Sequence, residues 1–263
     1  MKIEKYSISF VPLSERYGSE KRLFTIWFSI NLSIVCLTVG TLGILSGLDL
    51  TWTVLALVAG NAIGTVFMAA HSAQGPHLGI PQMIQSRAQF GVLGAAIPLI
   101  AVIITYVLYI SADQVVIRAT VLSLVPVGPD AAMSGFGFAA LIVAFIGYEL
   151  IHRIGVYLTF LSGLLFLSTA MILFLRGLAH ATLPVMPGGN FNLSTFMATF
   201  TQATAWSLTF GPYVADYSRY LRPEVPTSRT FWYTAAGNFL GASLIMCLGA
   251  IMASYYAQIA ADP

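Results

Sequence analysis

Long apolar runs separated by short polar stretches organise the whole chain. Seven of them are close to or above the roughly 20 residues that a helix needs to cross a bilayer. They lack the strict alternation of a strand, and in lipid only helices and closed barrels satisfy the backbone hydrogen bonds. The pattern therefore predicts an all-α polytopic membrane protein. The predicted spans are 23–48, 50–70, 92–122, 132–150, 155–175, 193–215 and 231–257.

The first 22 residues are polar and contain no short apolar stretch ahead of a small-residue cleavage site. We therefore interpret residues 1–22 as a cytoplasmic N-terminal tail and residues 23–263 as one transmembrane domain. Ten of the twelve arginines and lysines fall on the side of the amino terminus, and only Arg118 and Arg176 fall on the other. This asymmetry predicts a multi-pass protein of the plasma (cytoplasmic) membrane with its amino terminus inside and its carboxyl terminus outside.

The composition narrows the class of protein further. Hydrophobic residues make up 57% of the chain and charged residues 8%, against about 25% charged in an average soluble domain. Such a composition excludes a disordered chain, a coiled coil and almost any soluble enzyme of this length. With a net charge of +2 and no basic tract, no nucleic-acid partner is expected, and neither a cofactor nor an obligate protein partner is evident. We interpret Cys36 and Cys247, both inside apolar runs, as packing residues.

Two of the predicted spans contain signals for a break. The first carries the polar sequence 29–33 followed by two glycines, and the sixth carries hydroxyl residues throughout with Gly211-Pro212 inside it. Proline lacks a backbone donor and clashes with the preceding turn, so a kink near Gly211 is expected. The two spans are five apart, as equivalent elements of a five-helix inverted repeat would be, and broken helices in such positions indicate a midplane transport site. The alternative is a pair of kinked structural helices.

Two smaller patterns concern packing. Gly60/Gly64 and Gly237/Gly241 have GxxxG spacing, which lets helix backbones approach closely, and we expect ordinary intramolecular packing there. Between the second and third spans, a short helix is expected at the cytoplasmic interface. Its apolar face would carry Ile80, Met83, Ile84 and Ala88. His71 and His77 are interpreted as interfacial polar residues, because no carboxylate or cysteine accompanies them as a metal ligand.

Other seven-span classes fit the sequence less well. Receptors and retinal proteins keep the amino terminus outside, and the only lysines, Lys2, Lys5 and Lys21, lie outside every span, where no retinal Schiff base can form. An intramembrane metalloprotease is excluded by the lack of an HExxH motif. A channel remains open as an alternative, since hydroxyl-rich helices can line a pore.

Four stretches together carry a resemblance to a known family. They are Trp27–Asn31, Gly79–Gly91, Phe145–His152 and Asp216–Leu221, and their order and spacing agree from about residue 10 to the end. The chain resembles the nucleobase:cation symporter-1 family, the purine–cytosine permeases and their hydantoin- and allantoin-transporting relatives. The resemblance implies a secondary active transporter that imports a nucleobase (cytosine or purine) or related flat nitrogen heterocycle with Na⁺ or H⁺ by alternating access.

The same resemblance implies a five-plus-five inverted-repeat (LeuT-like) fold. Members of the family have about twelve spans, so the first repeat is complete in this chain and the second is only partly present. We therefore interpret the chain as a truncated gene product or a fragment that ends after the seventh span. The alternative to an active importer is a non-transporting fragment of such a permease.

In the third span the resemblance implies two substrate-binding residues. The family places an aromatic residue, usually tryptophan, and an amide one helical turn later, and these positions hold Tyr109 and Asp113 here. Residues four apart share a helix face, so both can reach one ligand. An aspartate only accepts hydrogen bonds, so Asp113 would favour a ligand rich in N–H groups or would carry the coupling proton. The alternative places Asp113 in the outer headgroups beside Arg118 as a solvated charge.

In the sixth span the corresponding segment is 206–210. By analogy with the family, Trp206 or Phe210 would stack opposite Tyr109, while Ser207 and Thr209 would bond the edge of the base.

Two further pairs of residues are assigned roles, one from the resemblance and one from its position in the chain. Leu32 and Val35 match positions whose backbone carbonyls help to hold sodium in relatives. Asp216 and Arg219, three residues apart at the end of the sixth span, are interpreted as an inner gate or a structural ion pair.

Overall fold

The computed structural model describes residues 6, 8–146, 148–180 and 191–261, and among them it contains helices and no β-strand. The α-helices are α1 (Glu20–Ile30), α2 (Ile34–Leu45), α3 (Leu50–Ser72), α4 (Gly75–Leu78), α5 (Gln82–Gly94), α6 (Ala96–Leu124), α7 (Pro129–Ile146), α8 (Tyr148–His180), α9 (Leu193–Leu208), α10 (Val214–Ser218) and α11 (Thr227–Ala261). Two 3₁₀-helices, η1 (Leu13–Glu15) and η2 (Gly211–Tyr213), complete the described elements. The predicted all-α architecture is confirmed.

Five helical segments of the described chain are long and apolar enough to cross a membrane, and the α1–α2 pair adds a sixth if it forms one bent span. The five are Leu50–Leu78, Ala96–Leu124, Pro129–Ile146, Arg153–Leu175 and Thr227–Tyr255. The predicted run 193–215 is divided among α9, η2 and α10, and α9 has only 16 residues. The protein is a multi-pass helical membrane protein.

The break predicted in the first span is confirmed. α1 ends at Ile30 and α2 begins at Ile34, and the two axes are bent by 57°. Ser33 caps α2, since its Oγ accepts a hydrogen bond of 3.2 Å from the backbone N–H of Cys36. A serine at this position satisfies one of the free backbone N–H groups at a helix start, which lowers the free-energy cost of starting a second helix here.

The break predicted near Gly211 is confirmed as well. α9 ends at Leu208, and the chain continues through η2, whose second residue is Pro212, before α10 resumes a helical path. Because proline has no backbone N–H and restricts the residue before it, the α-helical ladder cannot run through this point.

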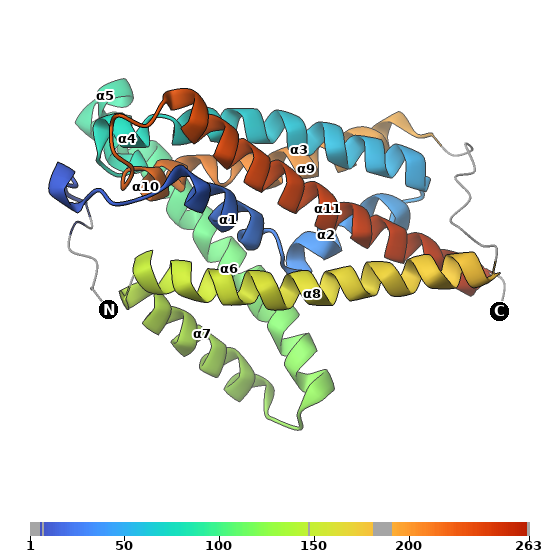
Figure 1. The fold of residues 1–263 in the computed structure, drawn as a ribbon. Coiled ribbons are helices and arrows are strands. Elements are labelled where there is room, and N and C mark those ends of the chain that lie inside the picture. Colours follow the sequence, from blue (N-terminus) through green and yellow to red (C-terminus); the bar gives the residue numbers. More distant parts are fainter. Residues whose placement is uncertain (1–5, 7, 147, 181–190, 262–263) are drawn as a thin grey trace.

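Helices α1, α2, α3, α9 and α11 pack into one bundle that holds most of the buried core (Figure 1). Among its largest fully buried side chains are Trp27, Leu23, Leu57, Met68 and Met246. The glycine pairs allow these helices to approach. A side-chain carbon at Gly60 or Gly64 would meet backbone atoms of α9, and one at Gly237 or Gly241 would meet backbone atoms of α1. The intramolecular use predicted for both pairs is confirmed.

Helices α6, α7 and α8 lie outside this bundle. In Figure 1, α6 starts beside α5 and runs away from the bundle, while α8 passes along it and α7 lies farther out. Val102 is the only buried residue of α6, and α7 has none. Large apolar side chains are therefore left exposed along all three helices.

The connection between α3 and α6 contains α4 and α5. α5 corresponds to the short helix expected near the cytoplasmic interface, and it is kinked at Gly91, whose φ is 71°. Its buried side chains are polar, namely Gln82, Gln85 and Ser86, whereas Met83 and Ile84 are only half-buried. The helix therefore turns its polar face toward the protein.

The segment before α1 is docked against this connection. Val11 and Arg16 are buried, and Arg16 donates hydrogen bonds of 2.9 Å to the carbonyl of Val11 and 2.6 Å to that of Pro76. The backbone N–H of Gly18 donates to the carbonyl of Tyr220 at 2.9 Å. Burial lowers the pKa of Arg16, and the negative charge of Glu224 opposes that shift.

Candidate functional site

A cavity of about 360 Å³ lies where both broken segments face α6. It brings together Tyr109 and Asp113 from α6, Val35 from α2, Trp206 from α9 and Phe210 from the break that follows. Five of the residues named from the sequence thus share one site. The other residues lining it are Ile30, Ser33, Tyr106, Ile110 and Tyr213.

Aromatic rings in edge-to-face contact form the walls of this cavity. The centroid of the Trp206 ring lies 6.2 Å from that of the Tyr109 ring, and the two planes meet at 76°. The corresponding values for Trp206 and Phe210 are 6.0 Å and 85°. Tyr213 continues the series, at 6.1 Å from Phe210 and 5.3 Å from Tyr106. Because successive rings are nearly perpendicular, a flat ligand that stacks on one ring meets the edge of the next.

Thr209 holds the ring of Tyr109 and is not among the residues that line the cavity. Its hydroxyl donates to the carbonyl of Trp206 at 2.7 Å and lies 2.8 Å from the hydroxyl of Tyr109. Since a threonine has a single hydroxyl proton, the tyrosine is the donor in the second bond. Tyr109 is thereby fixed at its far end with its ring toward the cavity.

Ser207 points away from the cavity into the bundle. Its side chain is fully buried and accepts a hydrogen bond of 2.9 Å from Nδ2 of Asn238. It also lies 3.4 Å from the hydroxyl of Thr65 on α3. The structure therefore places Ser207 behind Trp206, in contact with α3 and α11.

Asp113 is the one charged residue among those that line the cavity. It is half-buried on α6, one turn after Tyr109, while Arg118 is exposed. A carboxylate offers acceptors only and makes stronger hydrogen bonds than a neutral acceptor, more so where water is scarce. The cavity combines ring faces with a single anionic acceptor, which suits a flat ligand that carries N–H groups.

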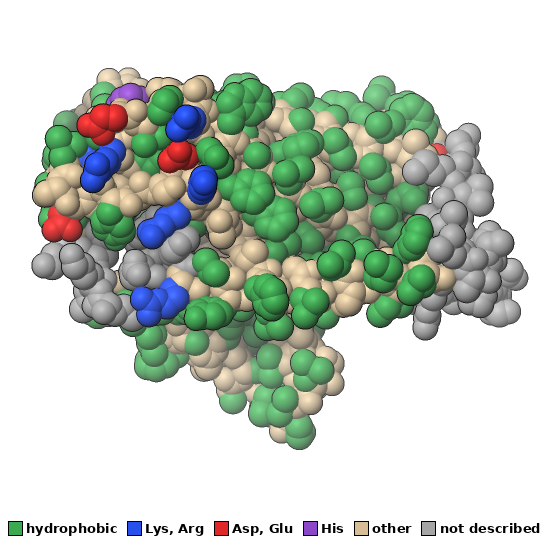
Figure 2. All heavy atoms as spheres, in the orientation of Figure 1, with side chains coloured by type: hydrophobic (Ala, Val, Ile, Leu, Met, Phe, Trp, Pro, Cys, Tyr) green, Lys and Arg blue, Asp and Glu red, His purple; other side chains and the backbone are tan. Residues whose placement is uncertain are grey.

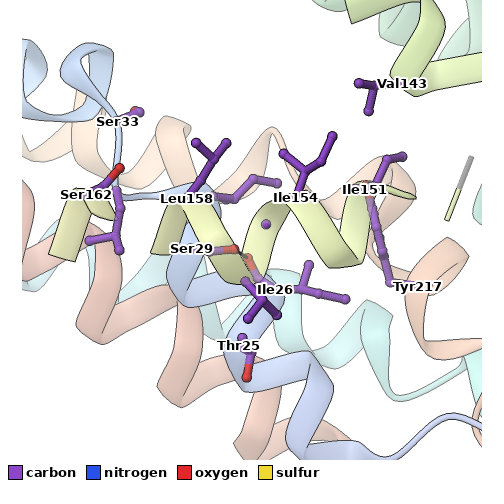
Figure 3. A pocket seen from close by; sticks show the side chains of 14 residues that line it. Thr25, Ile26, Ser29, Ser33, Val143, Ile151, Ile154, Leu158, Ser162 and Tyr217 are labelled. Carbon is purple, nitrogen blue, oxygen red and sulfur yellow. Dashed lines mark hydrogen bonds between the residues drawn. The ribbon is translucent and has the colours of Figure 1, made fainter. Parts of the chain in front are cut away.

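The two carbonyl positions named for a cation lie at the break of the first span, against different cavities. Val35 lines the aromatic cavity, whereas Leu32 lines a second cavity of about 320 Å³ between α1 and α8. Figure 3 shows that second cavity, with Ser29 of α1 facing Ile154 and Leu158 of α8. Its hydroxyl-bearing residues are Thr25, Ser29, Ser33, Ser162 and Tyr217. Among the described residues, no cluster of three histidine, cysteine, aspartate or glutamate side chains could hold a metal ion.

Asp216 and Arg219 line a third cavity of about 380 Å³, which shares Tyr106 and Tyr213 with the aromatic one. The carboxylate of Asp216 accepts a hydrogen bond of 2.6 Å from the backbone N–H of Gln82 at the start of α5. Burial raises the pKa of Asp216, against the opposing effects of that N–H and of the Arg219 charge. Arg219 in turn donates to the carbonyl of Tyr6 at 3.1 Å. The pair thus joins the ends of several elements at one face of the bundle.

Sequence reasoning missed several residues of the site, namely Ser33, Tyr106, Tyr213, Asn31 and Asn238. The first three line the cavity, and the two asparagines lie directly behind Trp206. The two asparagines could have been found from the sequence. An amide side chain inside an apolar span is energetically unfavourable and is usually retained for a function.

Fold and site together define a multi-pass helical membrane protein with an aromatic cavity at two helix breaks. A family model described as a permease for cytosine/purines, uracil, thiamine and allantoin matches residues 10–262. The chain belongs to this permease family. It is therefore a transporter-family protein rather than an enzyme, and the resemblance drawn from the sequence is confirmed.

Individual relatives agree with the family. YxlA of Bacillus subtilis (strain 168), named as a purine-cytosine permease, is 39% identical over 256 residues, which cover 96% of this chain and 54% of YxlA. The purine-cytosine permease FCY22 of Saccharomyces cerevisiae is 44% identical over 64 residues, or 24% of this chain and 12% of FCY22. The chain thus spans about half the length of YxlA. No solved structure matches it.

Proposed function

We propose that the chain provides the substrate cavity of a secondary active transporter that imports a nucleobase, cytosine or a purine, or a related flat nitrogen heterocycle with a cation by alternating access. One observation carries the proposal. The cavity at the two helix breaks places the rings of Tyr109, Trp206 and Phe210 beside the carboxylate of Asp113. The names of the family and of the relatives supply the substrate class.

In this proposal the base lies against an aromatic face and turns a hydrogen-bonding edge to α6. Tyr109 and Trp206 supply π-faces, and Phe210 closes the end of the slot. Asp113 accepts from ring or exocyclic N–H groups, and the hydroxyl of Ser33 is a further polar group on the opposite wall. Ser207 and Thr209 act by supporting Trp206 and Tyr109.

The coupling ion is Na⁺ or H⁺. For Na⁺, the backbone carbonyls of Leu32 and Val35 at the break of the first span would serve as oxygen ligands, as in other transporters with unwound helices. For H⁺, Asp113 is the group that would carry the proton. The breaks in the first and sixth spans, five apart, support the LeuT-like repeat as the fold of the complete transporter.

The proposed location is the plasma membrane, with the amino terminus in the cytoplasm. On the face shown in Figure 2, the lysine and arginine side chains gather, together with most of the acidic ones, at the end that carries α4, α10 and the start of α1, while apolar side chains are frequent along the rest of the described surface. That charge distribution is the one the positive-inside rule gives for a cytoplasmic end.

Binding and uptake by the whole chain test this function. The purified chain in detergent is incubated with radiolabelled cytosine, adenine, hypoxanthine, uracil, allantoin or hydantoin, and cells that express it are assayed for uptake with Na⁺ and pH varied. We expect saturable binding of at least one base and uptake driven by an ion gradient. Binding without uptake would favour the non-transporting fragment. Uptake that follows no ion gradient would favour a channel, and binding of none of the six would refute the substrate class.

A further inference from the structure

Behind the aromatic cavity, a chain of side-chain hydrogen bonds runs from Trp206 through the bundle. The indole N–H of Trp206 donates to Oδ1 of Asn31 at 2.6 Å. Nδ2 of Asn31 donates to Oδ1 of Asn238 at 3.1 Å and to the carbonyl of Trp27 at 2.7 Å. Nδ2 of Asn238 then donates to Thr65 at 2.7 Å and to Ser207 at 2.9 Å. One connected set therefore joins α9, the break after α1, α11 and α3.

Every donor of the two amides is used. Each amide nitrogen has two protons, and each of the four protons of Asn31 and Asn238 has an acceptor. Reversing either amide would set donor against donor, because Oδ1 of Asn31 must face the indole N–H and Oδ1 of Asn238 must face Nδ2 of Asn31. The set therefore allows one orientation of each amide, and with it one position of the indole.

Burial makes this arrangement rigid. Asn31, Asn238 and Ser207 are fully buried, and Trp206 is 9% exposed. In such surroundings water cannot replace a lost partner, so a rotated indole would leave its N–H and the oxygen of Asn31 unbonded. Asn31 also follows α1 directly, so the break of the first span is tied to the wall of the cavity.

We propose that Asn31 and Asn238 are positioning residues for the candidate base site, Asn31 by holding Trp206 through its indole N–H and Asn238 by holding Asn31. The assignment rests on the proposed function. Its consequence is chemical: Trp206 offers its ring to the cavity and has no N–H left for a carbonyl of the ligand. The polar groups that remain on the cavity wall are the carboxylate of Asp113 and the hydroxyls of Ser33, Tyr106 and Tyr213, and the one acceptor-only group among them, Asp113, favours heterocycles that donate to it.

Equilibrium binding of a radiolabelled base to the full chain in detergent tests this assignment through a double-mutant cycle. Trp206→Phe keeps an aromatic face but removes the N–H. We expect Asn31→Leu and Trp206→Phe each to weaken binding about tenfold, and the double variant to be no weaker than the weaker single variant. Losses that multiply in the double variant would mean that Asn31 does not act through the indole, and would overturn the proposal.

A matched control is available in the same bundle. Thr234 on α11 is also fully buried, and its hydroxyl lies 2.8 Å from that of Ser72 on α3, outside the set that holds Trp206. We expect Thr234→Val to change base affinity less than twofold. A loss as large as that of Asn31→Leu would show that any buried hydrogen bond of the bundle matters equally, which would overturn the positioning role.

The NMR signal of the Trp206 indole distinguishes a local effect on this side chain from a general loss of the fold. In the ¹⁵N-tryptophan-labelled chain, the indole signal of Trp206 is identified by its absence in Trp206→Phe. We expect Asn31→Leu and Asn238→Leu to shift this signal upfield, and Asn31→Asp, which keeps an oxygen acceptor, to shift it less and to retain more binding. An indole signal that none of these variants moves would overturn the proposal.

The outcomes also separate this inference from the proposed function. Wild-type chain that binds none of the six bases refutes the proposed function and the positioning role with it. Wild-type chain that binds a base with an affinity that Asn31→Leu leaves unchanged refutes the positioning role alone.

Discussion

Asp113 brings a full negative charge to a cavity whose other lining residues are uncharged. We expect Asp113→Asn to weaken base binding roughly tenfold or more, because a hydrogen bond to a charged acceptor contributes about 1.5–3 kcal/mol and a neutral one about 1 kcal/mol. Equilibrium binding at several pH values measures the effect. If the carboxylate carries the coupling proton, the pH dependence of uptake also disappears in this variant.

The control for that substitution is Asp130→Asn, at the exposed start of α7 and outside the cavities described above. It makes the same chemical change without touching the site, so its binding curve should match that of the wild type. Unchanged binding, uptake and pH dependence in Asp113→Asn would contradict both roles assigned to this residue.

A second prediction at this scale concerns Asp216. Burial raises the pKa of its carboxyl in the folded state above the ordinary value of about 4, so the fold binds a proton that the unfolded chain has already lost. Stability should therefore fall as pH rises from about 4 through that raised value. Asp216→Asn keeps an oxygen for the N–H of Gln82 and removes the buried charge, so the profile should flatten.

The measurement is the apparent melting temperature in detergent across that pH range for wild type and Asp216→Asn. Asp130→Asn provides the control, since it makes the same chemical change at an exposed position. Parallel profiles for the wild type and Asp216→Asn would show that Asp216 does not set the pH dependence.

At the scale of residues, most but not all of the candidate site could be predicted from the sequence. Tyr109, Asp113, Trp206 and Phe210 meet in one cavity, as expected from residues one turn apart on two helices. Ser207 does not reach it, because it follows Trp206 by one position and a helix turns by about 100° per residue. Which side chain faces the ligand depends on the rotation of α9 about its axis, and that rotation is set by packing against α3 and by the hydrogen bond from Asn238 of α11 to Ser207.

At the scale of elements, both helix breaks could be predicted because their causes are local. Ser33 caps a new helix, and Pro212 ends the α-helical ladder. The start of α8 could not be read in the same way. It begins at Tyr148, before the apolar run that starts at Gly155, because a helix can begin in polar sequence that hydropathy does not mark. The part of α8 that is apolar enough to cross a membrane is Arg153–Leu175, so the helix extends beyond its apolar part at both ends.

The close crossing of α3 and α9 gives the prediction at this scale. A side-chain carbon at Gly60 would meet the backbone carbonyl of Phe200 and the side chain of Ala203, and a backbone cannot move aside as a flexible side chain can. We expect Gly60→Ala to destabilise the protein by about 1–3 kcal/mol, the usual cost of overpacking. Thermal unfolding followed by size-exclusion chromatography measures it.

Gly135→Ala is the matched control, since a side-chain carbon there meets nothing within 4 Å. It should leave stability unchanged or raise it slightly, because glycine weakens a helix interior. Equal losses from the two substitutions would contradict the close α3–α9 packing.

For the whole molecule, hydropathy identified the spans but could not say which of them form the bundle. α6, α7 and α8 are as apolar as α3 and α11, yet α3 and α11 are buried in the bundle while α6, α7 and α8 are exposed. Lipid tails and a protein interior are both apolar, so membrane-facing and protein-facing helices have the same composition. The separation of these three helices from the bundle follows from tertiary packing alone.

The number of membrane crossings decides on which side each end of the chain lies. That number depends on whether α9 crosses the membrane. Its 16 residues extend about 24 Å, short of the roughly 30 Å hydrocarbon core, so it crosses only if η2, at about 2 Å per residue, continues its path. The positive-inside rule favours that crossing, since it places Arg219, Arg222 and Arg229 on the side of the amino terminus.

Labelling of introduced cysteines in the full chain tests this count. Ser46→Cys lies in the exposed turn between α2 and α3, and Glu224→Cys in the exposed turn before α11. With a membrane-impermeant maleimide on intact cells, we expect Ser46→Cys to react at once and Glu224→Cys to react only after the membrane is opened. The wild-type chain, whose Cys36 is buried and Cys247 half-buried, gives the background. Reaction of both positions on intact cells would mean that α9 does not cross, and the predicted arrangement of seven crossings with opposite ends would be wrong.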